Sequence, residues 1–391
     1  MKYIKRFLLL IFLLLIIAAI YVFYFTNSIK PTINSSEKNP YEFSVNRILD
    51  EPIIHKSSHQ LLEEETASIG YANINSPSLI RVPSWIDNPL GQYYLYFAHH
   101  KGSYIKLAFS DTITGPWTVY DHPILPLSES GLVQEEGTDT DLSTLIKYTS
   151  WSESLALIEV GDKAIKAYES RNQNKIKASS TTTPHLASPE VIIDNKTQQI
   201  RMYYHGIVDG SLQMSKVAIS EDGLKFKANP EIISLPYLRM FQIRGNNYGL
   251  AMPGFLYKTK DGLTDFHVRN KWIFDTDVRH SDVYVDGNSL WIYYSKVGDA
   301  PERIYYAHID VSSDDWNDWE LGPSKELLRP ELEWEGTHIS SAPSYRGEIS
   351  KVMNQIRDPH FFKDKDGKMF LLYTGSGEQA IGIVELKTNN K

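Results

Sequence analysis

The sequence predicts an all-β protein, a five-bladed β-propeller preceded by a single N-terminal transmembrane helix. A short pattern of small or polar residues, usually with a proline, precedes a burst of β-forming residues five times along the chain. Each copy is followed by further alternating strands. Aromatic residues make up 12% of the chain, with 24 Tyr, and flat rings suit pleated surfaces. Such a repeat is typical of small antiparallel sheets arranged radially around one axis.

The N-terminal 30 residues form a separate segment. Lys2, Lys5 and Arg6 precede an uninterrupted apolar run over residues 7–25, which is long enough to cross a bilayer as a helix. Bulky aromatic residues end this run where a cleaved signal peptide would have small ones, which favours an uncleaved anchor. The positive charge before the run predicts that the folded domain lies outside the cytoplasm, on the membrane, or alternatively is secreted.

The rest of the chain divides into a linker and one folded domain. Residues 31–40 are rich in polar residues and predict a linker, and residues 41–391 are expected to form the propeller. The segment 41–54 is expected to supply an outer strand that pairs with the last blade and closes the ring.

Alternating or continuous apolar runs predict the inner strands of four blades. The pairs are 92–98 with 104–109, 200–204 with 215–219, 290–294 with 304–308, and 369–373 with 380–384. Blade three, around residues 252–275, is short, and its outer strands are not defined by the pattern. The interval 121–187 holds either a strand pair at 155–158 and 164–168 or an insertion over the central funnel.

Charge and cysteine content exclude some classes of protein. The net charge of −8 and the lack of a basic stripe argue against a nucleic-acid-binding protein. The chain has no Cys, so neither a disulfide framework nor a thiolate metal site is available.

The five repeat copies place equivalent residues in two rings around the axis, because residues two apart in a strand point the same way. The first ring is Ser76, Ser188, Met252, His280 and Asp358. The second ring is Ser78, Glu190, Gly254, Asp282 and His360. Burying unpaired charge is costly, so these polar rings indicate a water-filled funnel. The alternative is that the same groups only satisfy backbone donors at the strand starts.

The order of motifs resembles a known family. Ser-Pro-Ser-Leu-Ile-Arg at 76–81, Tyr-Tyr-Leu-Tyr-Phe-Ala at 93–98, Leu-Ala-Phe-Ser-Asp at 107–111 and Gly-Pro-Trp at 115–117 resemble the opening blade of five-bladed β-propeller glycoside hydrolases. These are the arabinanase and β-xylosidase group. Arg357-Asp358-Pro359 is similar to the Arg-Asp-Pro motif of invertase-type enzymes, whose aspartate contacts sugar hydroxyls and stabilises the transition state.

The resemblance covers roughly residues 70–388 as architecture. It implies a glycoside hydrolase-like protein that acts on an oligo- or polysaccharide at the propeller axis by acid/base catalysis.

One position departs from the family pattern. The family presents an aspartate immediately before the first proline, and this chain has Ser76 there. A serine cannot replace a carboxylate that deprotonates water or attacks an anomeric carbon. Either another blade supplies the base, or the protein is a non-catalytic glycan-binding propeller of the cell envelope. A protein-interaction propeller is a third, less favoured hypothesis.

Three carboxylates remain as catalytic candidates. Glu190 is the candidate acid, because desolvation in an otherwise apolar strand would raise its pKa. Asp358, beside Arg357, is expected to stay ionised and to act as base or as a stabiliser that binds sugar hydroxyls. Asp282 is the third option, as base or as a group that tunes the other two.

Further side chains are candidates for binding the substrate, namely Arg357, His185, His280, His360, Ser76 and Ser188. For each histidine the alternative is a hydrogen-bonded structural role. No metal or cofactor is assigned, because the sequence shows no metal-ligand spacing. The expected partners are a carbohydrate substrate and, through the N-terminal helix, the membrane, with the protein a monomer.

Overall fold

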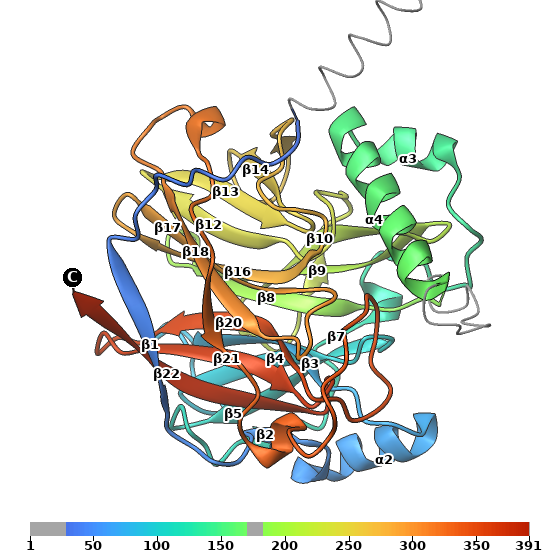
Figure 1. The fold of residues 1–391 in the computed structure, drawn as a ribbon. Helices are drawn as coiled ribbons and strands as arrows, with labels where there is room; N and C mark the ends of the chain where they lie inside the picture. Colours follow the sequence, from blue (N-terminus) through green and yellow to red (C-terminus); the bar gives the residue numbers. More distant parts are fainter. Residues whose placement is uncertain (1–28, 170–182, 391) are drawn as a thin grey trace, which may run out of the picture.

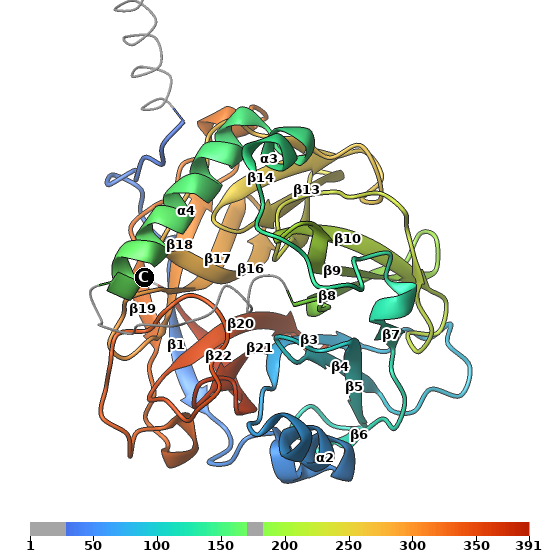
Figure 2. The ribbon, with the colours of Figure 1, turned by 90° about the vertical axis from the view of Figure 1, so that its right-hand side faces the viewer.

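The computed structural model describes residues 29–169 and 183–390, and it contains five antiparallel sheets arranged around one axis (Figure 1). Each sheet is one blade of a propeller, seen face-on in Figure 2. The all-β, five-bladed architecture expected from the repeat is therefore confirmed.

The blades follow one another along the chain. Blade one contains β3 (Asn75–Arg81), β4 (Tyr93–Ala98), β5 (Tyr104–Ser110), β6 (Thr118–Val119) and β7 (Leu125–Pro126). Blade two contains β8 (Ala187–Asp194), β9 (Gln199–Asp209), β10 (Leu212–Ser220) and β11 (Lys227–Ala228). Blade three contains β12 (Arg239–Ile243), β13 (Asn246–Ala251), β14 (Phe255–Thr259) and β15 (His267–Val268). Blade four contains β16 (Val278–Asp286), β17 (Ser289–Lys296), β18 (Ile304–Asp310) and β19 (Lys325–Leu328). Blade five contains β20 (Ile356–Lys363), β21 (Met369–Gly375), β22 (Ala380–Asn390), β1 (Tyr41–Arg47) and β2 (Ile54–His55).

The ring is closed by strands from the two ends of the folded domain. β1 pairs antiparallel with β22 from Tyr41 opposite Asn390 to Arg47 opposite Val384. Phe43 of β1 also packs edge-on against Trp291 of blade four, with ring centroids 4.9 Å apart. The expected closure by the segment 41–54 is thus observed, and it covers the edge that β22 would otherwise expose.

Blade three differs from the expectation. Its innermost strand is β12, whereas Met252 and Gly254 lie in the turn that leads into β14, the third strand of the blade. The pattern at 252–256 does mark a strand start, but not one at the axis. Only 28 residues separate Met252 from His280, too few for four strands of typical length and their connections.

The interval 121–187 holds an insertion that is helical where the structure describes it. α3 (Leu142–Tyr148) and α4 (Trp151–Glu169) replace the alternative of a strand pair, and both lie in front of the blades in Figure 2. α3 begins at Asp141, whose carboxylate accepts from the backbone N–H of Thr144 at 2.8 Å.

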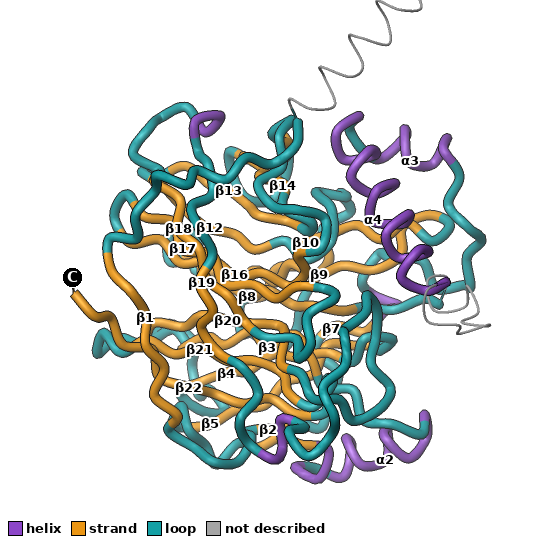
Figure 3. Tube along the Cα trace, in the orientation of Figure 1, coloured by secondary structure: helices purple, strands orange, loops and turns teal. Residues whose placement is uncertain are grey.

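One further α-helix, α2 (Gln60–Ile69), precedes β3. The short 3₁₀ helices are η1 (Lys56–Ser58), η2 (Leu127–Glu129), η3 (Trp316–Asp318) and η4 (Glu333–Glu335). Figure 3 shows that α2, α3 and α4 lie at the periphery of the molecule, outside the strands that form its body.

The expected membrane-spanning run at 7–25 lies outside the described residues. Within residues 29–169 and 183–390, no helix has both the length and the apolar character needed to cross a bilayer. The described chain begins at Ile29, which is buried and accepts a hydrogen bond on its carbonyl from the backbone N–H of Trp272 at 3.3 Å. It continues along blade four, where the N–H of Asn34 donates to the carbonyl of Leu321 at 2.8 Å.

Candidate active site at the propeller axis

Five residues near the axis share an unusual backbone conformation, one at the start of each innermost strand. Their φ angles are 50° at Ser76, 53° at Ser188, 60° at Tyr237, 42° at His280 and 52° at Asp358. Side chains other than glycine rarely adopt this region, and such strain often marks a functional position. In blades one, two, four and five the residue lies at a bulge, where the pairing register shifts.

These five residues, which we call the upper ring, contact one another across blade boundaries. The hydroxyls of Ser76 and Ser188 lie 3.0 Å apart, and the N–H of Ser76 donates to Asp358 Oδ2 at 3.3 Å. His280 Nδ1 lies against Asp358 Oδ1. The Tyr237 ring packs on the His280 ring with centroids 4.5 Å apart. Four of the five predicted members are therefore confirmed in position, and Tyr237 replaces Met252.

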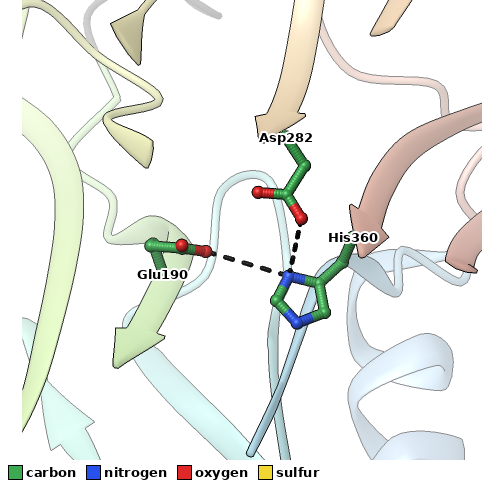
Figure 4. A group of neighbouring side chains, drawn as sticks. All are labelled: Glu190, Asp282 and His360. Atoms are coloured by element: carbon green, nitrogen blue, oxygen red, sulfur yellow. Dashed lines mark ion pairs between the residues drawn. The ribbon is translucent and has the colours of Figure 1, made fainter. Parts of the chain in front are cut away.

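The second set of equivalent positions, the lower ring, lies two residues further along each strand. It consists of Ser78, Glu190, Arg239, Asp282 and His360, with Arg239 in place of the predicted Gly254. His360 Nδ1 lies 3.3 Å from Asp282 Oδ2 and 3.8 Å from Glu190 Oε2, as Figure 4 shows. The Arg239 guanidinium lies 3.2 Å from Glu190 Oε2 and 3.8 Å from Asp282 Oδ1.

Backbone groups orient the lower ring. The N–H of Leu79 donates to His360 Nε2 at 2.9 Å, so Nδ1 carries the ring proton and faces the two carboxylates. Burial lowers the pKa of His360, but the charge and hydrogen bond of Asp282 outweigh this effect and leave it raised. Arg239 also donates to the carbonyl of Ser281 at 3.0 Å, which fixes its guanidinium between blades three and four.

The pKa of Glu190 suits a proton donor. Its pKa is raised to about 7 by burial, which desolvates the carboxyl, and by the charge of Asp282, against the lowering effects of Arg239 and His360. A carboxyl with such a pKa holds its proton in a large fraction of molecules near neutral pH. The expectation of a raised pKa at Glu190 is met for the physical reason given.

The lower ring also has the donor set of a metal site. Among the described residues, Glu190, Asp282 and His360 each offer one ligand atom, and these atoms lie within 4.8 Å of one another. However, Arg239 already brings a positive charge to both carboxylates, and the His360 nitrogen that faces them carries a proton. These residues therefore do not fit a resident cation as they are arranged.

Arg357 does not pair with Asp358, contrary to the expectation from their adjacency. Its guanidinium donates to Glu302 Oε2 at 2.7 Å and to Glu378 Oε1 at 3.0 Å, with all three side chains fully buried. Arg279 lies beside the same carboxylates, 3.9 Å from Glu302 and 4.0 Å from Glu378. The Arg357 guanidinium is therefore bound by Glu302 and Glu378, and it acts on Asp358 only through its charge.

The pKa of Asp358 is consequently raised, not held low. Burial is the main cause and the neighbouring Glu378 adds to it, while Arg357 and Arg279 oppose it. Asp358 also accepts a hydrogen bond from the hydroxyl of Thr374 at 3.1 Å. Arg357 does favour the ionised form of Asp358, as expected, but burial and Glu378 outweigh this effect, so the pKa is raised and not lowered.

A row of aromatic side chains continues from the upper ring into blade two. The ring of His205 packs against Tyr237 with centroids 4.4 Å apart, and His185 lies 6.2 Å from His205. Burial holds the pKa of both histidines below its usual range, well below in His205. His185 Nδ1 also lies 2.8 Å from the carbonyl of Thr183. His185 is therefore near the site but behind the ring that surrounds the axis.

The rings are closed to solvent, which corrects the expectation of a water-filled funnel. Glu190 and His360 are 5% exposed, and Asp282 and Asp358 are 2% and 1% exposed. A cavity of about 380 Å³ lies further along the innermost strands, beyond the lower ring. It is lined by residues 79–81, 191–193 and 362–365.

Residues 344–349, which we call the strap, are hydrogen-bonded to Arg279, the neighbour of His280 in the upper ring, and to Glu378. The carbonyl of Tyr345 accepts from Arg279 at 2.8 Å, and Arg346 donates to the carbonyl of Thr276 at 2.7 Å. The Glu348 carboxylate lies 2.6 Å from Lys101, and the N–H of Ile349 approaches Glu378 at 3.4 Å.

The strap thus joins blades four and five to the segments that border blade one. Tyr71, which precedes β3, donates from its hydroxyl to Glu348 at 3.2 Å. Asn73 donates to the carbonyl of Ile349 at 3.5 Å.

Several important residues were missed from sequence. Tyr237 and Arg239 follow a proline, Pro236, but no second small residue, so the repeat pattern passed over them. The spacing between blades was the signal that could have found them. Glu302 and Glu378 lie in connections between strands, where no periodicity identifies them.

No protein-family profile matches the sequence. An uncharacterized protein of Acanthamoeba polyphaga mimivirus, R118, is 28% identical over 339 residues, which are 80% of this chain and 83% of that protein.

Similar solved structures include glycoside hydrolases of the group that the sequence motifs resemble. One is a GH43 β-xylosidase/α-arabinofuranosidase from a compost microbial metagenome, in complex with xylotriose (12% identity, 88% of this chain and 95% of that chain, TM-score 0.49). Another is the Cellvibrio cellulosa α-L-arabinanase complexed with arabinohexaose (11% identity, 81% and 92%, TM-score 0.44). The assignment of the fold rests on the strand pairing of this chain itself.

Proposed function

We propose that this chain is a glycoside hydrolase-like protein that acts on an oligo- or polysaccharide at the propeller axis by acid/base catalysis. The observation that carries the proposal is the Glu190 carboxyl, desolvated at the axis beside Asp282 with a pKa raised to about 7. Glycosidic cleavage needs such a protonated carboxyl together with an ionised one.

Each carboxylate has a role in this mechanism. Glu190 donates its proton to the oxygen of the leaving sugar. The negative charge of Asp282 helps to raise the pKa of Glu190. Asp282 also accepts a hydrogen bond from His360 Nδ1–H. Asp358, in contact with His280, is the base that takes the proton of the attacking water. This assignment places the base in blade five, because blade one presents Ser76.

The remaining candidate residues bind the substrate or position other side chains. The hydroxyls of Ser76 and Ser188 and the ring of His280 are placed in the upper ring to meet sugar hydroxyls. Arg357 acts as a positioning residue, since it fixes Glu302 and Glu378 behind the ring. Because the residues of both rings are buried, substrate entry requires a rearrangement at the axis, and we assign it to the strap, which is hydrogen-bonded to Arg279 and Glu378.

The proposed setting is the outer surface of a membrane. The apolar run 7–25 would cross the bilayer once and leave the propeller outside the cytoplasm as a monomer.

The test is an assay of the full chain in detergent micelles on a panel of aryl glycosides and oligosaccharides. Wild-type turnover should fall by about 10²–10⁴ in Glu190→Gln and in Asp358→Asn, because each removes a proton-transfer group. Glu221→Gln, in an exposed turn of blade two, is the matched control. Turnover that survives both axis substitutions would refute the mechanism.

A non-catalytic glycan-binding propeller is the second candidate. Ser76 in place of the family's aspartate and the full burial of the rings favour it. Glycan binding by the wild type without turnover on any member of the panel would support this candidate over hydrolysis.

A further inference from the structure

The helical insertion carries an exposed apolar face. Leu142 and Ile146 of α3 are 60% and 62% exposed, and Trp151 and Ile158 of α4 are 56% and 45% exposed. Residues four or seven apart lie on one side of a helix, so each pair forms a stripe along its helix. We call these four residues the insertion face.

Other side chains of the same helices are packed on the propeller. Leu145 and Tyr148 of α3 and Ala156 of α4 join an apolar cluster that also contains Trp272 and Ile29. The insertion face is therefore apolar surface in addition to what these helices bury. Exposed apolar residues that are scattered singly need no explanation, whereas this insertion exposes two pairs of large ones on consecutive helices.

Ile29 connects this face to the apolar run at the N-terminus. Ile29 is 3% exposed and lies in the same cluster as the inner sides of α3 and α4. Only three residues separate it from Phe25, the last residue of the run, and the four steps between the two positions span at most roughly 14 Å. The end of the apolar run is thus held within a short distance of the insertion.

The two views of the fold agree with this placement. In both Figure 1 and Figure 2, α3, the first turn of α4 and the beginning of the described chain lie at the same end of the molecule.

We propose that the insertion face lies in the interfacial layer of the bilayer that the apolar run enters, so that the propeller is docked on the membrane and not merely tethered to it. The proposal rests on the membrane anchor proposed above, but not on the glycosidase activity. The occupant of the face is lipid, because a short tether brings the face to the headgroup region, where amphipathic helices bury apolar side chains.

The residues of the face suit that environment. Tryptophan is enriched at the membrane interface, where its apolar ring and polar N–H are both accommodated. Lys147 is next to Ile146, and its ammonium folds over the Tyr148 ring at 4.5 Å and reaches Asp209 at 3.3 Å. A long basic side chain of this kind can keep its charge in the headgroup layer while neighbouring apolar groups go deeper.

The absence of cysteine from the chain allows a direct test. The full chain is prepared as Ile146→Cys, labelled with an environment-sensitive fluorophore, and reconstituted in vesicles of phosphatidylcholine and phosphatidylglycerol. Leu90→Cys is the matched control, an exposed apolar position in the β3–β4 connection. Ile158→Cys is a second reporter on α4, and circular dichroism checks that each variant is folded.

The expected result is that nitroxide-labelled lipids quench the fluorophore at 146 and 158 at least about threefold more than at 90, as for side chains inserted in the interface. Aqueous iodide should quench the fluorophore at 90 more than at 146 or 158. Equal iodide quenching and no lipid quenching at all three positions would overturn the proposal.

Two other outcomes also decide against it. In the first, the fluorophore is protected from iodide but is not quenched by nitroxide-labelled lipids, and the protection weakens when the protein is diluted. This would mean that a second copy of the chain covers the face. Failure of the unlabelled full chain to float with vesicles would remove the anchor on which docking depends. Neither result bears on turnover in micelles, so the failure of this inference is distinguishable from failure of the glycosidase proposal.

Discussion

Arg239 donates to the carboxylate of Glu190 across 3.2 Å, and both side chains are buried where blades two and three meet at the axis. The same guanidinium lies 3.8 Å from Asp282 of blade four. One cation thus links three blades and neutralises two carboxylates that could not otherwise be buried together. The electrostatics of the site and the cohesion of the ring depend on the same residue.

Arg239→Met should be strongly destabilising, because it leaves Glu190 and Asp282 buried without their cation. The expected loss is about 3–5 kcal/mol in the free energy of unfolding, measured by denaturant titration. Arg329→Met removes an exposed arginine paired with Glu326, and it should cost much less, because water screens a surface ion pair. Similar losses in the two variants would contradict this account of the axis.

Glu190→Gln should change how stability depends on pH. The raised pKa means that folded wild type keeps this proton while the unfolded chain releases it, so wild-type stability falls as pH rises from about 4.5 to about 7. The glutamine variant lacks this effect. Its stability relative to wild type should improve by about 1–3 kcal/mol across that window, in unfolding titrations at both pH values. Parallel pH profiles for the two proteins would show that Glu190 is not perturbed.

His205→Phe should protect the fold against acid. Burial holds the pKa of His205 well below its usual range, so below about pH 6.5 the unfolded chain binds a proton at this residue and the folded state does not. Wild-type stability therefore falls as the pH falls below this value. Phenylalanine keeps a ring against Tyr237 but does not titrate. Relative to wild type, the variant should gain about 2 kcal/mol between pH 7 and pH 5, when measured by denaturant unfolding. If the difference in unfolding free energy between the variant and wild type does not change with pH, this explanation is wrong.

Phe43→Ala should weaken the closure of the ring. Phe43 is 7% exposed and packs against aromatic rings of blade four, including Trp291 and Tyr306. The expected cost is about 3–5 kcal/mol, since a large buried aromatic side chain is removed. Ser44→Ala, the next residue of β1, should cost less than about 1 kcal/mol. If both variants unfold at the same denaturant concentration as wild type, β1 does not hold the ring.

The fold was largely predictable because four innermost strands each begin with their own short signature. Since side chains alternate along a strand, residue parity alone then places Glu190, Asp282 and His360 in one ring. β12 escaped because its start, Tyr237-Leu238-Arg239, carries neither the proline between ring positions nor a small residue before it. An apolar run such as 155–158 fits a strand or a buried helix equally well, which explains why α4 could not be predicted.

Burial of the site could not be predicted. The strap has no regular secondary structure, and its contacts with Arg279 and Glu378 are single hydrogen bonds that no sequence pattern reveals. The partners of Arg357 were equally hidden, because Glu302 and Glu378 belong to connections far from it in sequence. Adjacency in sequence suggested a pair with Asp358, but two buried glutamates bind the Arg357 guanidinium instead.

The seam between β1 and β22 joins residues 41–47 to residues 384–390. During synthesis the first strand emerges long before its partner exists, so blade five stays incomplete until β22 has been made. A chain that stops short of β22 leaves β1 without its partner strand. Pairing of these two strands is the event that closes the ring.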